Sequence, residues 1–171
     1  MTISMSSASL PICKTMLANL SHLLDRGQAH AQAKEFDPAA LLQFRIAPDM
    51  LPFTRQIQIA CDAAKNGLAR LSGAEAPRFE DSEATFAELK GRIQKTLAFL
   101  ASVPPESIDG TEEKEITFPI GREKTRTMTG EAYLKHWMLP NLFFHVTMAY
   151  AILRHNGVEL GKSESLAGGR M

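Results

Sequence analysis

The sequence predicts an all-α protein: a four-helix bundle with long crossover connections and a small β-hairpin before the last helix. Three observations lead to this fold class. Four segments carry apolar residues at helical spacing, long stretches without that period separate them, and one connection holds two short runs of strand type. Four amphipathic helices are typical of a bundle, and their connections need not follow a simple up-and-down order.

The first three helices are predicted from their apolar faces. The second helix begins after Pro52 and ends before Gly73. The third runs from about Ser82 to Ala101, with Asp81 or Ser82 as its N-cap residue. In the first helix, residues at steps of three, four and seven share one face: Cys13, Met16, Leu17, Leu20, Leu24 and Ala31.

The fourth helix is expected from Pro140 to His155 and is apolar almost all round. A helix without a wide polar face is buried on several sides, or shared between a core and a subunit interface. Proline fits the first turn of a helix better than its middle. We therefore expect a separate short helix from Thr129 to Met138, with a kink at the proline.

Two connections are long, residues 32–51 and 104–128. In the second, residues 115–118 and 125–128 flank Pro119-Ile120-Gly121, which predicts a β-hairpin on the outside of the bundle. Residues 158–171 are rich in Gly, Ser and charge and are expected to form a flexible tail.

Composition excludes several classes of protein. The 171 residues suffice for one core, so a single domain over 1–171 is expected. With 19 basic and 19 acidic residues the chain lacks the broad basic surface of a nucleic-acid-binding protein, and no run of 18 apolar residues predicts a membrane span. Cys13 and Cys61 are lone thiols without metal-finger spacing. We expect a cytoplasmic protein with buried, reduced cysteines and neither nucleic-acid nor membrane partners.

One histidine lies where chemistry is expected. His145 falls in the apolar fourth helix, four residues after Asn141 and therefore on the same face. An imidazole in such surroundings needs a partner or stays neutral. Two interpretations remain open: a core histidine hydrogen-bonded to another helix, or a ligand or general base.

Polar residues of the second helix are the candidate partners of this histidine. Gln56, Gln58 and Asp62 flank the apolar stripe of that helix and can reach inward near its edge. Asp62 is placed to orient the imidazole or to accept a hydrogen bond from Tyr150, or it is a solvated surface residue.

Residues 139–162, LPNLFFHVTMAYAILRHNGVELGK, resemble a bacterial family called domain of unknown function 1993. Three further stretches are similar to it: APDMLP at 47–52, RQIQIACD at 55–62 and FEDSEATF at 79–86. The resemblance therefore extends over nearly the whole chain, and it weakens at residues 163–166.

This family resembles a branch of the DinB-like superfamily, which implies a DinB-like four-helix bundle and frequent dimers. Many members hold a divalent metal with one His from the second helix and an HxxxH pair from the last. Aligning the shared LR-x-NG ending places that pair on Asn141 and His145, and the second-helix His near Gln56 or Gln58. Only His145 of the three ligands is kept, and zinc or nickel prefers nitrogen donors to an amide oxygen.

The resemblance and the residues together predict a dimeric, non-catalytic or small-ligand-binding protein with a degenerate metal site. Its expected ligand is a small apolar molecule or a thiol, and its expected partner is a second copy of the chain. The alternative is a divalent-metal-dependent enzyme, of thiol S-transferase or hydrolase type, that uses His145 to hold zinc or nickel.

Overall fold

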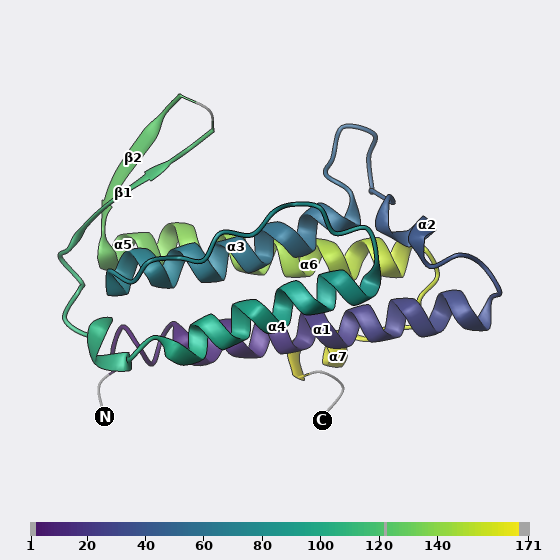
Figure 1. Ribbon diagram of the computed structural model, residues 1–171, viewed down its shortest axis with the longest axis horizontal. Helices are drawn as coiled ribbons and strands as arrows, with labels where there is room; N and C mark the ends of the chain where they lie inside the picture. Colours follow the sequence, from purple (N-terminus) through teal and green to yellow (C-terminus); the bar gives the residue numbers. More distant parts are fainter. Residues whose placement is uncertain (1–2, 122, 168–171) are drawn as a thin grey trace.

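Four long helices form the body of the molecule, in a computed structural model that describes residues 3–121 and 123–167. They are α1 (Leu10–Ala33), α3 (Phe53–Ser72), α4 (Phe86–Ser102) and α6 (Leu139–His155). Figure 1 shows α3 beside α6 in one half of the bundle and α4 with α1 in the other; α6 and α4 each pack against both α1 and α3. The predicted all-α bundle is confirmed.

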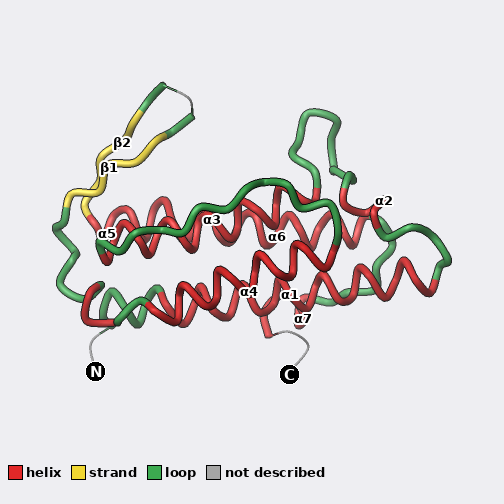
Figure 2. The backbone as a smooth tube through the Cα atoms, viewed as in Figure 1, coloured by secondary structure: helices red, strands yellow, loops and turns green. Residues whose placement is uncertain are grey.

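Shorter elements connect these helices, as Figure 2 shows. They are α2 (Ala39–Leu42), a 3₁₀ turn (Pro105–Ser107), β1 (Glu115–Pro119), β2 (Thr125–Thr129), α5 (Gly130–Tyr133), a π-helical turn (Leu134–Met138) and α7 (Lys162–Ala167). In the described part of the chain, no helix is both long and apolar enough to cross a membrane.

The predicted ends of α3 are confirmed, and their local chemistry explains them. Pro52 has an extended backbone and occupies the N-cap position, where the missing N–H of proline costs nothing. Gly73 ends the helix in the left-handed region, at φ 83°, and its N–H donates to the carbonyl of Ala69. Glycine adopts this conformation without strain, which explains why the helix stops here.

The predicted start of α4 is wrong by four residues. Its N-cap is Thr85, whose Oγ1 accepts the N–H of Glu88 while the Glu88 carboxylate accepts the N–H of Thr85. This reciprocal pair is a capping box, which satisfies two N–H groups that the first turn leaves free. Asp81 and Ser82 lie in the preceding connection instead.

That connection, residues 73–85, is here called the strap. Figure 1 shows the strap running back along α3, so that α3 and α4 point in the same direction. The rings of Phe53 and Phe86, each the first residue of its helix, accordingly lie only 6.0 Å apart. The strap is a third long crossover, in addition to the two that the sequence predicts.

The helix before Pro140 is not separate from the last helix. α5, the π-helical turn and α6 follow one another without a break, and Pro140 lies in the first turn of α6 as expected. A π-helical turn widens the helix by one residue. This widening falls directly before the proline, which has no N–H to continue the regular ladder.

The predicted hairpin is present and is fastened to the bundle by aromatic side chains. β1 and β2 pair antiparallel, with Glu115 opposite Thr129, and the hairpin projects from one end of the bundle (Figure 1). Phe118 is buried, and its ring lies 4.9 Å from the rings of both Tyr133 and Trp137. Because a lone two-stranded hairpin is barely stable, these contacts are what hold it in place.

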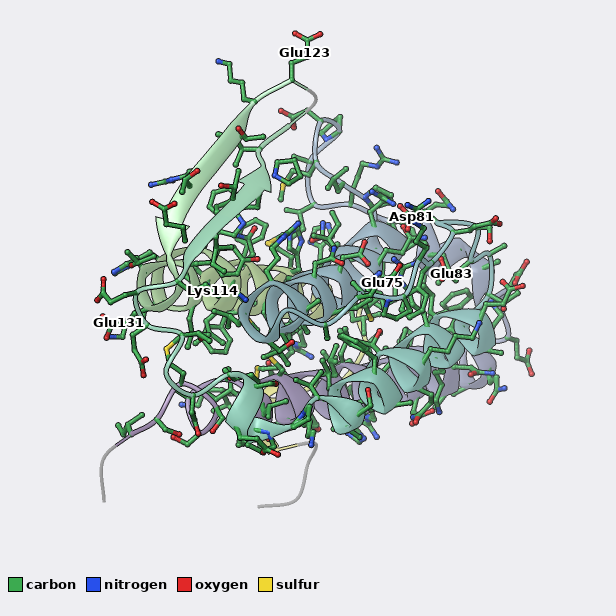
Figure 3. All side chains as sticks on the ribbon, turned by 60° about the vertical axis from the view of Figure 1, so that its left-hand side comes forward. Glu75, Asp81, Glu83, Lys114, Glu123 and Glu131 are labelled. Carbon is green, nitrogen blue, oxygen red and sulfur yellow. The ribbon has the colours of Figure 1, made fainter. Side chains whose placement is uncertain are left out.

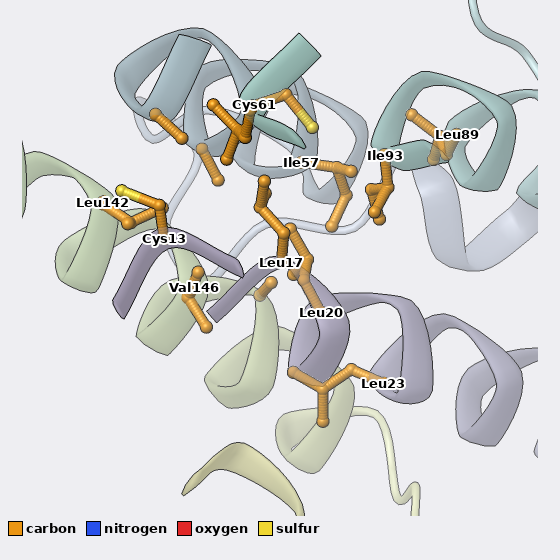
Figure 4. Packing of buried hydrophobic residues seen from close by; sticks show 14 of the residues in the cluster. Cys13, Leu17, Leu20, Leu23, Ile57, Cys61, Leu89, Ile93, Leu142 and Val146 are labelled. Carbon is orange, nitrogen blue, oxygen red and sulfur yellow. The ribbon is translucent and has the colours of Figure 1, made fainter. Parts of the chain in front are cut away.

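The core lies between the four long helices (Figure 4). Leu17, Ile57 and Val146 come from three different helices and are almost completely removed from water. Cys13 and Cys61 are free thiols within the same cluster, as the sequence predicts. Burial raises the pKa of each thiol to about 12, so both stay protonated at neutral pH.

The segment expected to be a flexible tail contains packed residues. Val158 and Leu160 are buried, and α7 lies against α1, where the Asn19 side-chain N–H donates to the carbonyl of Ser165 at 2.9 Å. Periodicity did not indicate this helix because it has only six residues. Residues 168–171, which end the predicted tail, lie outside the described residues.

Candidate functional site

A hydrogen bond between α6 and α3 forms the centre of the candidate site. His145 is only 8% exposed, and its Nδ1 lies 2.7 Å from Oε1 of Gln56. Gln56 is also buried, and its Nε2 donates to the carbonyl of Leu51 at 2.9 Å. The Leu51 carbonyl sets the orientation of the amide, so Oε1 faces the imidazole and can only accept. Nδ1 therefore carries the ring proton and Nε2 keeps its lone pair.

The surroundings of His145 keep its imidazole uncharged. Burial, and to a smaller extent the positive charge of Arg55, lower the pKa of His145 from the usual 6.5 to about 4. At neutral pH the ring is thus a hydrogen-bond acceptor or a base, with its free lone pair on Nε2.

Two exposed apolar residues adjoin this polar pair. The ring of Phe144 stands edge-on to the imidazole, 5.2 Å between centroids, and is 54% exposed. Leu51, whose carbonyl holds Gln56, is 46% exposed. Phe143 is 41% exposed but lies two residues from His145 and so faces about 200° away from it on the helix. We call Leu51 and Phe144 the apolar rim. Large apolar side chains exposed together around a polar centre are typical of a binding surface.

Two predicted site residues on α6 do not join the pair. The Asn141 side-chain N–H donates to the carbonyl of Trp137, one turn earlier, at 2.7 Å. Tyr150 packs half-buried against the core, and its hydroxyl has no hydrogen-bond partner among the described residues. The predicted bond from Tyr150 to Asp62 is therefore not formed.

Gln58 and Asp62 belong to a different polar cluster. Residues two apart on a helix point about 200° from each other, so Gln58 faces away from the side of Gln56. Its Nε2 donates to Glu83 of the strap at 2.8 Å. Asp62 pairs with Arg92 at 3.0 Å and with Lys65 at 3.1 Å. Of the alternatives that the sequence leaves open for Asp62, neither the contact with His145 nor the one with Tyr150 is formed among the described residues.

Arg92 is the centre of that second cluster, and it is not among the site residues predicted from the sequence. Its side chain is 1% exposed and contacts three carboxylates, those of Asp62, Asp81 and Glu83, at 3.0 to 3.1 Å. Figure 3 shows Asp81 and Glu83 together at the end of the strap. One signal pointed to this residue: Arg92 falls on the apolar face of α4, between Leu89 and Thr96.

The donors near His145 do not fit the three-His metal site that the resemblance implies. Gln56 Oε1 accepts the imidazole proton, the Asn141 amide is bound within its own helix, and Asp62 is neutralised elsewhere. Over residues 3–121 and 123–167, no three His, Cys, Asp or Glu side chains lie close enough to hold an ion. One imidazole with amide oxygens is a poor donor set for zinc or nickel.

Comparisons with known proteins place the chain in a family. A crystal structure of a DinB family member protein from Shewanella denitrificans has a TM-score of 0.86 and 39% sequence identity, over 94% of this chain and 90% of that one. No curated protein matches the chain. The family described as domain of unknown function (DUF1993) matches residues 5–166. This chain therefore belongs to the DUF1993 family, and its fold is that of a DinB family member.

Proposed function

We propose that this protein is a dimeric small-ligand-binding protein, without catalytic activity, whose ancestral metal site has degenerated. The observation that carries the proposal is the hydrogen bond between His145 and Gln56 inside the apolar rim. The resemblance gives metal ligands to the position of His145 and to one near Gln56 or Gln58, and here His145 is hydrogen-bonded to Gln56 instead. What remains is an apolar surface with one free acceptor, Nε2 of His145.

The outward side of α6 supports the dimer. No Asp, Glu, Lys or Arg occurs in this helix before Arg154. Outward-facing residues follow a helical stripe, here called the outer face: Pro140, Phe143, Phe144, Thr147, Met148 and Ala151. An exposed apolar face on a helix is the usual mark of an interface.

The expected ligand is a small apolar molecule or a thiol. The apolar rim offers contact to an apolar body, and the lone pair of Nε2 offers an acceptor to a single weak donor such as S–H. A thiol that carries an apolar group satisfies both features.

The alternative function is a divalent-metal-dependent enzyme of thiol S-transferase or hydrolase type that uses His145. One observation favours it: a neutral imidazole with a free Nε2 is the form that binds metals. The protein residues near that atom would then leave most coordination positions to water or substrate.

Light scattering tests the proposed dimer. At tens of micromolar we expect twice the 18.8 kDa of one chain, and we expect Phe143→Ser to give a monomer with unchanged helical circular dichroism. The matched control is Leu166→Ser, which removes an equally exposed apolar side chain from α7 and should stay dimeric. A monomeric wild-type protein would overturn the proposed dimer. Dissociation of both variants would show that the outer face is not the specific interface of the dimer.

A further inference from the structure

A hollow between the strap and α4 has features of a second binding site. Its volume is about 400 Å³, and its lining includes Arg78, Phe79 and Glu80 of the strap and Gly91, Arg92 and Lys95 of α4. It uses none of the residues of the apolar rim or of the outer face. A ligand in this hollow would therefore bind independently of the proposed dimer and of His145.

The lining of the hollow contains a glycine, Gly91, that packing does not explain. The two other glycines within long helices lie against neighbours: a Cβ on Gly27 would meet Leu153 at 3.1 Å, and one on Gly67 would meet Met138 at 2.5 Å. A Cβ on Gly91 would meet nothing within 4 Å. Glycine weakens the interior of a helix. Its presence here leaves the backbone of α4 open to a molecule in the hollow.

The charges around the hollow divide into satisfied and unsatisfied groups. Arg92 is neutralised by Asp62, Asp81 and Glu83. The carboxylate of Glu88, also in the lining, accepts the N–H groups of Ala84 and Thr85.

Three charged side chains of the lining remain. Arg78 and Lys95 form no ion pair or side-chain hydrogen bond with any described residue, and neither does the carboxylate of Glu80. All three side chains are exposed, so the hollow presents to solvent two cations and one anion that have no charged partner among the described residues. An anion alone would be opposed by Glu80, and a cation alone would be opposed by Arg78 and Lys95.

We propose that this hollow binds a small zwitterion of the amino-acid type. Its carboxylate lies between Arg78 and Lys95, its ammonium group faces Glu80, and its side chain lies against Phe79. The missing side chain at Gly91 leaves room for the molecule next to the backbone of α4. Only a ligand that carries both charges complements all three free groups at once.

Matched ligands test the charge requirement. L-phenylalanine is titrated against the isotope-labelled full chain and followed at the Gly91 amide resonance, beside phenylacetate, which lacks the ammonium, and phenethylamine, which lacks the carboxylate. We expect a saturable shift with L-phenylalanine and at least about tenfold weaker binding of the other two. Equal binding of phenylacetate, or no shift with L-phenylalanine at tens of millimolar, overturns the proposal.

Substitutions test the residues. We expect Gly91→Ala to raise the midpoint of thermal unfolding and to weaken binding about tenfold, two effects that a purely structural glycine would not combine. Gln94→Ala, on an exposed position of the same helix outside the hollow, should leave binding unchanged. Lys95→Gln should weaken the binding of L-phenylalanine. Glu80→Gln should strengthen the binding of phenylacetate relative to that of L-phenylalanine. Wild-type binding in both Gly91→Ala and Lys95→Gln would refute the assigned site.

Discussion

The imidazole Nδ1 of His145 lies 2.7 Å from the amide oxygen of Gln56, and this hydrogen bond connects α6 to α3. The resemblance to the DinB-like superfamily implies a metal ligand at His145 and another near Gln56 or Gln58. The amide is held in turn by the carbonyl of Leu51. A buried pair whose facing atoms, Nδ1 and Oε1, are hydrogen-bonded to each other can persist without an ion, which is the basis of the proposed degenerate site.

The two members of this pair should be energetically coupled. Gln56→Leu leaves the Nδ1–H of His145 buried without an acceptor, so we expect a loss of about 1–3 kcal/mol in the free energy of unfolding. The double variant Gln56→Leu/His145→Leu should cost clearly less than the sum of the two single changes. Urea unfolding measures all three, with Gln94→Leu on an exposed position as the control. Additive costs would show that the bond contributes nothing.

Stability should fall as the pH drops from about 6.5 to about 4. The unfolded chain binds a proton at His145 near pH 6.5, whereas in the folded chain its pKa is lowered to about 4. Between these values the unfolded state holds more protons, so acid favours unfolding, by at most about 3 kcal/mol from this group. His145→Gln should flatten this part of a plot of unfolding free energy against pH. An unchanged slope in the variant would show that groups other than His145 cause the pH dependence.

Arg92 should be the most sensitive charged residue for stability. Arg92→Met leaves the largely buried carboxylate of Glu83 without its cation, while Asp62 keeps only Lys65, and breaking a buried pair in this way costs about 3–5 kcal/mol. Lys135→Met removes an exposed pair with Glu131 and should cost less than about 1 kcal/mol. Chemical unfolding compares the two variants. Similar small losses in both would mean that the strap is held by other contacts.

Alanine substitutions at two glycines, Gly130 and Gly91, should change the stability of the protein in opposite directions. At Gly130, where β2 meets α5, a Cβ would lie 2.0 Å from the backbone oxygen of Thr111, which cannot turn aside. We expect Gly130→Ala to destabilise the protein by about 1–3 kcal/mol or more, and Gly91→Ala to stabilise it by about 1 kcal/mol. Thermal unfolding of both variants is the measurement. A neutral Gly130→Ala would mean that the base of the hairpin can move.

Features set by neighbouring residues were predictable from the sequence. Pro52 and Gly73 mark the ends of α3 by local backbone chemistry, and the hairpin follows from alternating residues around a turn. The start of α4 is also set by neighbouring residues, because the pattern Thr85-x-x-Glu88 indicates a capping box. The predicted N-cap residues, Asp81 and Ser82, do not use this pattern.

Features that depend on distant residues were not predictable in the same way. Arg92 collects carboxylates from α3 and from the strap, and no period in the sequence links those positions. The pairing of His145 with Gln56 was among the open alternatives, because both flank apolar stripes, but nothing local distinguished Gln56 from Gln58. The choice follows from which face of α3 packs against α6 and which meets the strap.

The most direct test of the degenerate site is the metal content of untagged protein. Elemental mass spectrometry should compare the wild type with His145→Ala prepared identically, each after dialysis against added zinc or nickel. We predict no metal in the wild type beyond the amount in the variant, because Gln56 Oε1 already accepts the proton of His145 and, in the described part of the chain, no three His, Cys, Asp or Glu side chains lie close enough to hold an ion. Near-stoichiometric zinc, nickel or iron that is lost in His145→Ala would contradict this account and favour the metal-dependent enzyme.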